Sequence, residues 1–105
     1  MVEGQIYFQL QEPTRNESVS VATTNTVIAE ARIQDVPRRV IVVRNNGDTN
    51  LTCNLGQQAA VSNNGILLKP GESFSDSSES GYQCHQGIIT AISETSANNV
   101  SIMER

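Results

Sequence analysis

The segment from Arg38 to Leu55 constrains the fold more than any other part of the chain. A β-branched run at 40–43 is followed by Asn-Asn-Gly-Asp at 45–48 and by an alternating run at 51–55. An Asn-Gly pair between two such runs is a strong signal for a β-hairpin, because both residues adopt positive φ at low cost. The sequence therefore predicts that 40–43 and 51–55 pair as a hairpin. Because 40–43 is apolar on both faces, we expect it at the centre of a sheet.

The same pattern of short runs and turns continues through the rest of the chain. Further apolar or alternating runs lie at 5–10, 27–33, 65–68, 87–93 and 100–104. Turn signals stand at Asn64-Gly65, Pro70-Gly71 and Asn98-Asn99. In the run 27–33, the residues expected to face inward are Val27, Ala29, Ala31 and Ile33. The fold class predicted is all-β: a single compact β-sandwich, jelly-roll-like, of about eight short antiparallel strands.

The first 24 residues have the weakest strand pattern. We expect 1–24 to be an N-terminal strand or arm that docks on a neighbour, and 25–105 to be the sandwich domain. In the run 5–10, three apolar side chains share one face and are candidate partner-binding residues: Ile6, Phe8 and Leu10. The composition is only 37% hydrophobic with no Trp, so the core is lean and association with a partner would stabilise it.

Charge and hydropathy narrow the choice of partners. The net charge is −4, which disfavours nucleic acid because phosphate contacts need clustered Lys and Arg. No apolar run reaches the roughly 20 residues of a membrane helix, and the start of the chain lacks the pattern of a secretory signal. The densest basic group is Arg38, Arg39 and Arg44. Its members either carry charge and salt bridges at the ends of a strand or contact an acidic partner surface.

The two cysteines, Cys53 and Cys84, lie 31 positions apart. Buried, reduced thiols are the simpler interpretation, since free Cys behaves as a small hydrophobe. A disulfide stays open as an alternative. Cys53 alternates with Leu51 and Leu55, which places it on an apolar face and favours the core.

The chain shows little equipment for catalysis. His85 is the only histidine, and a Ser-His-Asp triad has no motif to fix it. Cys84 and His85 are adjacent and would point to opposite faces of a strand, which disfavours a shared metal ion with Cys53. Asp76 and Glu79 could hold calcium, but a solvated loop is the simpler interpretation. We therefore expect no catalytic, metal or cofactor site, and a binding or structural module instead of an enzyme.

Five segments together resemble small β-sandwich virion proteins of tailed bacteriophages, of the head decoration or cement type. They lie at 39–45, 51–56, 65–74, 82–93 and 100–105, and include a Leu-Lys-Pro-Gly-Glu turn and a Gly-Ile-Ile-Thr-Ala-Ile strand. The resemblance covers about 38–105 and consists mainly of structural turns. It implies a protein of the capsid surface, made in the host cytoplasm, that binds the major capsid protein. It further implies a symmetric homo-oligomer, most often a trimer, with no nucleic acid, membrane or cofactor.

Two other functions remain open. A tail, adaptor or receptor-binding module would use the polar segment 76–81 and Tyr82, facing a partner or a host glycan. A small enzyme would depend on His85. Loss of an activity on replacing His85 with Ala would be the sign of the latter.

Overall fold

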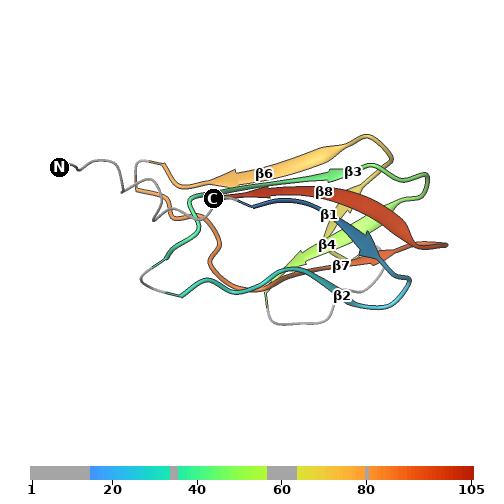
Figure 1. Cartoon of the computed structure of the whole chain (residues 1–105), viewed down its shortest axis with the longest axis horizontal. Helices are drawn as coiled ribbons and strands as arrows, with labels where there is room; N and C mark the ends of the chain where they lie inside the picture. The colour runs from blue at the N-terminus through green and yellow to red at the C-terminus, as the bar shows by residue number, and fades with distance from the viewer. Residues whose placement is uncertain (1–14, 34–35, 57–63, 80) are drawn as a thin grey trace.

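The chain folds into two stacked antiparallel sheets (Figure 1). The structure is a computed structural model that describes residues 15–33, 36–56, 64–79 and 81–105. Within these ranges the strands are β1 (Arg15–Val21), β2 (Thr26–Ala29), β3 (Val40–Asn45), β4 (Leu51–Leu55), β5 (Ile66–Leu68), β6 (Ser73–Ser77), β7 (Ile89–Ser93) and β8 (Asn98–Glu104). The first sheet has the order β1-β8-β3-β6, and the second has the order β2-β7-β4-β5.

The strand pairing identifies a jelly roll. The chain is folded back on itself, so that β1 pairs with β8, β2 with β7, β3 with β6 and β4 with β5. The two further pairs, β3 with β8 and β4 with β7, join these ribbons into the two sheets. Eight strands in this order form the double-sheet jelly roll built from two Greek keys. The predicted fold class is confirmed.

The predicted hairpin between 40–43 and 51–55 is wrong. Both strands form, as β3 and β4, but they belong to different sheets. β3 is central in its sheet, as expected, between β8 and β6. At its end the Asn45 side chain accepts a hydrogen bond from the backbone N–H of Gly47 and donates one to the carbonyl of Thr49. These bonds fix a turn that carries the chain across to the second sheet.

The core lies between the sheets and is aliphatic. Fully or almost fully buried residues from both sheets and from the β6–β7 connection form one cluster, which comprises Val21, Ile28, Ala29, Ile41, Val43, Leu51, Cys53, Leu68, Cys84, Ile89, Ala91, Val100 and Ile102. Cys53 is 0% exposed, which confirms it as a core residue. Both cysteines are free, so the open alternative of a disulfide does not hold.

Two local predictions fail where the register differs from simple alternation. β2 ends at Ala29, with a register shift between Val27 and Ala29. Val27 is therefore turned outward and is 40% exposed, while Ile33, beyond the strand, is 66% exposed. The expected turn at Asn98-Asn99 is also absent, because both residues belong to β8 and Asn98 is buried.

The sandwich begins earlier in the chain than the boundary drawn from the sequence. β1 pairs with β8 along all seven of its residues, and Val21 is 0% exposed. Residues 15–21 therefore lie in the sheet, although they fall in the range 1–24 assigned to an arm. The candidates Ile6, Phe8 and Leu10 lie outside the described residues. In the described ranges, no helix could span a membrane.

Candidate functional site

One end of the sandwich carries a cluster of buried and partly buried charged side chains, here called the charged end: Arg15, Arg32, Arg38 and Glu104. Glu104 closes β8, and its side chain is 3% exposed. Three guanidinium groups surround its carboxylate. Nε of Arg38 lies 2.7 Å from Oε2, Nε of Arg32 lies 3.5 Å from Oε2, and Nη1 of Arg15 lies 3.2 Å from Oε1.

Arg38 is the structural centre of the charged end. Its side chain is 0% exposed, and besides Glu104 it donates hydrogen bonds to three backbone carbonyls. These belong to Glu30 after β2 and to His85 and Gly87 in the connection between β6 and β7. The planar guanidinium, with five N–H donors in a fixed fork, suits such a junction. Arg38 thereby ties both sheets together at this end.

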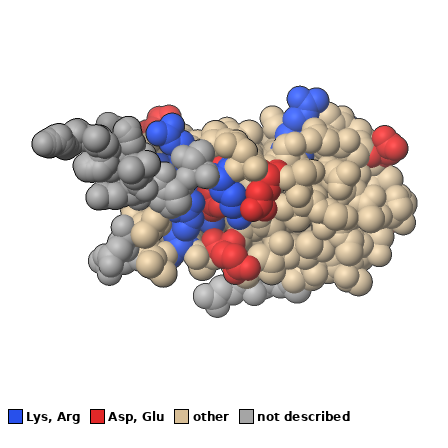
Figure 2. Space-filling model, in the orientation of Figure 1, with Lys and Arg blue, Asp and Glu red and all other residues tan. Residues whose placement is uncertain are grey.

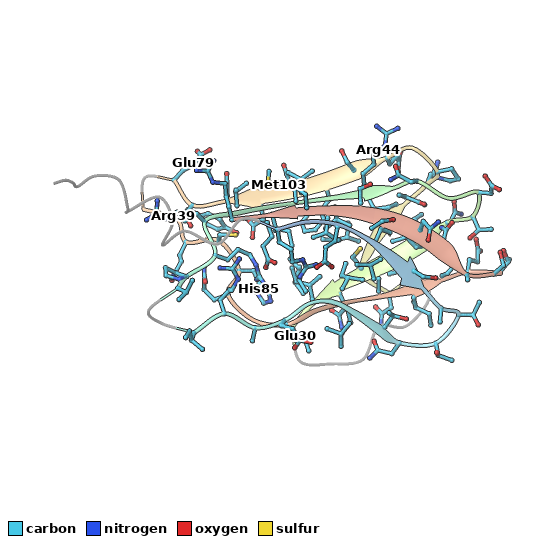
Figure 3. All side chains as sticks on the ribbon, viewed as in Figure 1. Glu30, Arg39, Arg44, Glu79, His85 and Met103 are labelled. Atoms are coloured by element: carbon cyan, nitrogen blue, oxygen red, sulfur yellow. The ribbon has the colours of Figure 1, made fainter. Side chains whose placement is uncertain are left out.

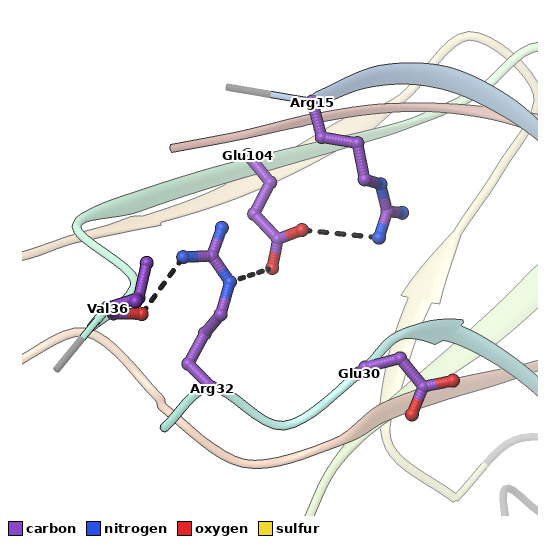
Figure 4. A pocket seen from close by; sticks show the side chains of 5 residues that line it. All are labelled: Arg15, Glu30, Arg32, Val36 and Glu104. Atoms are coloured by element: carbon purple, nitrogen blue, oxygen red, sulfur yellow. Dashed lines mark hydrogen bonds and ion pairs between the residues drawn. The ribbon is translucent and has the colours of Figure 1, made fainter. Parts of the chain in front are cut away.

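An open pocket of about 270 Å³ lies over the buried ion pairs (Figure 4). Its lining residues are Arg15, Glu30, Arg32, Val36 and Glu104. Arg15 reaches it from β1 and also donates a hydrogen bond to the carbonyl of Ile28 at 2.6 Å. Arg32 reaches it from the segment after β2 and donates one to the carbonyl of Val36 at 3.1 Å. Figure 4 shows the two guanidinium groups on opposite sides of the Glu104 carboxylate.

The charges are unevenly spread over the molecule. On the face drawn in Figure 2, blue and red side chains gather toward the end that carries the pocket, and most of the remaining described surface is uncharged. Arg44 of β3 points away from the sandwich (Figure 3) and is exposed. The predicted basic group therefore divides. Arg38 forms a buried salt bridge at the start of β3, while Arg44 lies on the outer face of the first sheet.

The only histidine does not form a catalytic triad. Asp76 accepts a hydrogen bond from the backbone N–H of His85 at 2.9 Å, and not from its ring. Nε2 of the ring lies 3.2 Å from the carbonyl of Ile88. Asp76 also accepts a hydrogen bond from the Tyr82 hydroxyl at 2.8 Å. Burial acts to raise the pKa of Asp76, but the hydrogen bonds from the His85 backbone and from Tyr82 together outweigh it and lower the pKa. This carboxylate organises the loop after β6.

Tyr82 is the one predicted partner-binding residue that lies in the described ranges. It is 55% exposed and fixed by its hydroxyl bond to Asp76, whose carboxylate raises the pKa of the tyrosine. The segment 76–81 is shorter as a loop than the sequence suggested, because Asp76 and Ser77 belong to β6. Tyr82 also closes an isolated bridge with Glu79. The tyrosine is therefore presented from a well-anchored loop.

The outer face of the second sheet carries a second feature, here called the outer patch: Val27, Thr52, Leu67, Thr90 and Ile92. Register places Thr52 between Ile92 and Leu67, and Val27 beside Thr90. Successive strand residues point to opposite faces, so these side chains face away from the core. Val27 and Leu67, on the two edge strands, are 40% and 41% exposed, whereas Thr52 and Thr90 between them are buried. The patch contains no charged residue.

Buried thiols and metal-ligating groups offer no other site in the described ranges. Burial raises the pKa of the Cys53 thiol to about 12 and that of Cys84 to about 11, so neither is an activated nucleophile. Among the residues described, no group of three or more His, Cys, Asp or Glu side chains could hold a metal ion.

Sequence reasoning missed three members of the charged end. These residues, Arg15, Arg32 and Glu104, lie far apart in the chain. They meet because β1 pairs with β8 and because the chain after β2 reaches the same end of the sandwich. A weak signal existed: Glu104 continues the inward-facing alternation of Val100 and Ile102. A carboxylate at an inward position requires a cation nearby.

Comparison with protein-family models, with curated proteins and with solved structures finds no match to the chain.

Proposed function

We propose that the chain is a structural protein of a bacteriophage virion, a capsid decoration or cement protein that binds and stabilises the lattice of the major capsid protein. In this role it forms a symmetric homo-oligomer, for which a trimer is favoured, on the capsid surface. It acts by contact alone and needs no cofactor. The proposal combines the sequence resemblance over about 38–105 with the geometry of the sandwich.

The jelly roll supports this assignment at the level of fold. Double-sheet jelly rolls serve as viral capsid and lectin domains and as cupins. Fold alone does not decide function, which depends on the surfaces that a fold presents. In this chain Arg38 and Glu104 brace the sandwich and Asp76 organises a loop. These groups are engaged in structure, which favours a module that works by binding.

The observation that carries the proposal is the outer patch. A sheet face that stays in water normally carries polar residues at its exposed positions. On this face the exposed side chains include Val27 and Leu67 on the two edge strands, with Ile92 half-buried between them. Exposed apolar side chains on a sheet face are suited to burial against another subunit. Many copies on one lattice would make modest contacts effective through avidity.

A paired substitution tests the patch. Val27→Glu with Leu67→Glu should abolish binding to isolated capsids of the phage that encodes the chain, because burying carboxylates in an apolar contact is costly. The matched control is Ser18→Glu with Ser75→Glu, at exposed outward positions of the first sheet. Co-sedimentation with capsids, after circular dichroism has verified the fold, is the measurement. Equal binding by both double variants would remove the patch from the proposal.

The N-terminal segment offers an independent test of attachment. The proposal includes an arm before β1, in which Ile6, Phe8 and Leu10 contact a neighbouring subunit by adding to a sheet edge. Deleting residues 1–12 should then abolish oligomerisation or capsid attachment, as measured by light scattering and co-sedimentation. An unchanged oligomeric mass together with unchanged capsid binding would contradict the role of the arm and leave the outer patch as the contact.

A second candidate function is favoured by Tyr82. A tyrosine that is half exposed and held by a hydrogen bond to Asp76 offers a rigid aromatic contact at low entropic cost. In a tail, adaptor or receptor-binding module, this loop would face a partner or a host glycan. Cryo-microscopy of virions separates the two functions, because the first predicts density on the head and the second on the tail.

A further inference from the structure

We propose that the pocket at the charged end binds a carboxylate group. The first support is the balance of charge. The cluster contains three guanidinium groups around the single buried carboxylate of Glu104. It therefore carries two more positive than negative charges, inside a chain whose net charge is −4. In a partly enclosed site such an excess attracts anions more strongly than the same charges would in open water.

Among the described residues, two acidic side chains near the pocket limit this excess without removing it. Glu17 lies 3.7 Å from Nε of Arg15, but its side chain is 54% exposed. Glu30 lines the pocket and is exposed, and Figure 4 shows its carboxylate turned away from Glu104. Water screens charges in such positions. The positive groups behind Glu104 are better shielded from solvent, since Arg38 is 0% exposed and Arg32 is 14% exposed.

The second support is unused donor capacity. Nε of Arg15 is buried and has no hydrogen-bond partner, since 3.7 Å to Glu17 is too long for one. Arg32 uses Nη1 for Val36 and Nε for Glu104. A second carboxylate beside Glu104 could therefore accept a charge-assisted hydrogen bond from Nε of Arg15 and pair with the positive charge of Arg32.

The third support is size. Sites for drug-sized ligands run from about 300 to 1,000 Å³, and this pocket of about 270 Å³ falls just below that range. It suits a single small group better than a nucleotide or an oligosaccharide. The aliphatic stems of Arg15 and Arg32, together with Val36, would contact the methylene groups that lead to the carboxylate. The carboxylate could come from an acidic side chain of a protein or from a free organic acid. In either case the inference is independent of the capsid role.

The test is a titration followed by NMR on the full ¹⁵N-labelled chain, reading the Nε–Hε signals of arginine. The probes are glutarate and an N-acetylated, C-amidated Glu-Glu peptide, with inorganic phosphate as the comparison anion at constant ionic strength. We expect saturable shifts at Arg15 and Arg32 with both carboxylates, and no shift at the exposed Arg44. Tighter binding of the peptide would identify a protein side chain as the source, and tighter binding of glutarate a free acid.

Two variants and a control make the result specific. Arg32→Gln should weaken carboxylate binding at least about tenfold, the value of one charge-assisted hydrogen bond. Arg32→Lys keeps the charge without the fork and should give an intermediate loss, while Arg44→Gln should change nothing. Amide spectra establish that each variant is folded. The proposal is overturned if no shift saturates, if Arg32→Gln binds as the parent does, or if phosphate binds as tightly as the carboxylates.

Discussion

The two ends of the sandwich are closed by different chemistry, although β3 contributes to both. At the charged end, Arg38 precedes the strand and pairs with Glu104 at 2.7 Å. At the opposite end, β3 finishes in Asn45, which is 0% exposed and uses neutral hydrogen bonds only. The first arrangement leaves an open pocket over spare guanidinium donors. The second leaves its central side chain fully satisfied.

The second cluster, here called the amide end, consists of Asn45, Gly47, Thr49 and Asn98. Nδ2 of Asn45 donates to the carbonyls of Thr49 and Leu68, and Oδ1 accepts from Gly47 N–H and from Nδ2 of Asn98. The packing is tight, because a Cβ added at Gly47 would lie 1.3 Å from Oδ1 of Asn98. All hydrogen-bonding capacity of the Asn45 amide is thus used. An end without spare capacity serves structure, whereas an end with spare capacity can also bind.

Removing Arg38 should have the largest effect on stability. Arg38→Met leaves the Glu104 carboxylate buried without its closest cation and also leaves three carbonyls unpaired. Breaking a buried ion pair by removing one partner costs about 3–5 kcal/mol. Urea denaturation should show this loss in the free energy of unfolding, with Arg44→Met as the exposed control at below about 0.5 kcal/mol. A loss below about 1 kcal/mol would mean that Arg15 and Arg32 replace Arg38, and the contrast between the ends would be weaker.

Removing Asn45 should cost less, because no charge is left behind. Asn45→Ala leaves the Gly47 N–H and the Leu68 carbonyl without the partners they have now. An unsatisfied buried polar group costs about 1–3 kcal/mol. We expect a loss of that order in the same urea assay, independent of salt. Asn46→Ala, an exposed neighbour in the turn, is the control. A loss equal to that of Arg38→Met would contradict the ranking of the two ends.

The reactivity of the two cysteines reports on local opening, at the charged end for Cys84 and in the middle of the second sheet for Cys53. At pH 8 both thiols should react slowly with iodoacetamide, because their pKa values are raised from 9.0 to about 12 and about 11. Cys84 lies in the β6–β7 connection held by Arg38, and Cys53 lies in the middle of the second sheet. Arg38→Met should therefore accelerate alkylation of Cys84 more than that of Cys53, as mass spectrometry of the peptides would show. Asn45→Ala should not accelerate alkylation of Cys84 more than alkylation of Cys53.

The raised pKa values also set a direction for stability against pH. Unfolded thiols ionise near 9.0, while the folded ones keep their protons up to about 11 and about 12. The native state then binds more protons, so the free energy of unfolding falls as the pH rises from about 9 to about 12. Cys53→Ala should reduce this fall. A stability that rose over the same range would contradict the burial of Cys53.

The sequence predicted what depends on local pattern and failed where distant segments meet. Short runs that are apolar on both faces located β3 and β7, and alternating runs located β4 and β8 and placed Cys53 in the core, because such patterns are local properties of the chain. The Asn-Gly pair also predicts the change of chain direction after β3, as the structure shows. It does not predict which strands pair, because the same residues can form a hairpin turn or a crossover between the two sheets. The Asn45 side chain and its contact with Asn98, 53 positions away, decide between them.

The charged end illustrates the same limit at the level of function. Arg38 could be singled out as a charge at a strand end, but its role depends on Glu104, 66 positions away. Arg15 and Arg32 join the cluster through the pairing of β1 with β8 and the course of the chain after β2. Only the jelly-roll order brings these four side chains to one end. A pocket made of such residues has no linear motif.

The smallest expected effect separates the binding role of the charged end from its structural role. Arg32 is partly accessible, and its Nε lies 3.5 Å from Glu104, compared with 2.7 Å for Arg38. Arg32→Gln should therefore lower the free energy of unfolding by less than about 1 kcal/mol, the usual value of an ion pair near the surface. Raising the NaCl concentration should reduce the difference in the free energy of unfolding between Arg32→Gln and the parent chain, since salt screens exposed ion pairs most. Urea denaturation at two salt concentrations makes this measurement. If Arg32→Gln instead destabilised the fold as much as Arg38→Met, Arg32 would be a second structural clamp, and the donors assigned to a bound carboxylate would be needed by the sandwich itself.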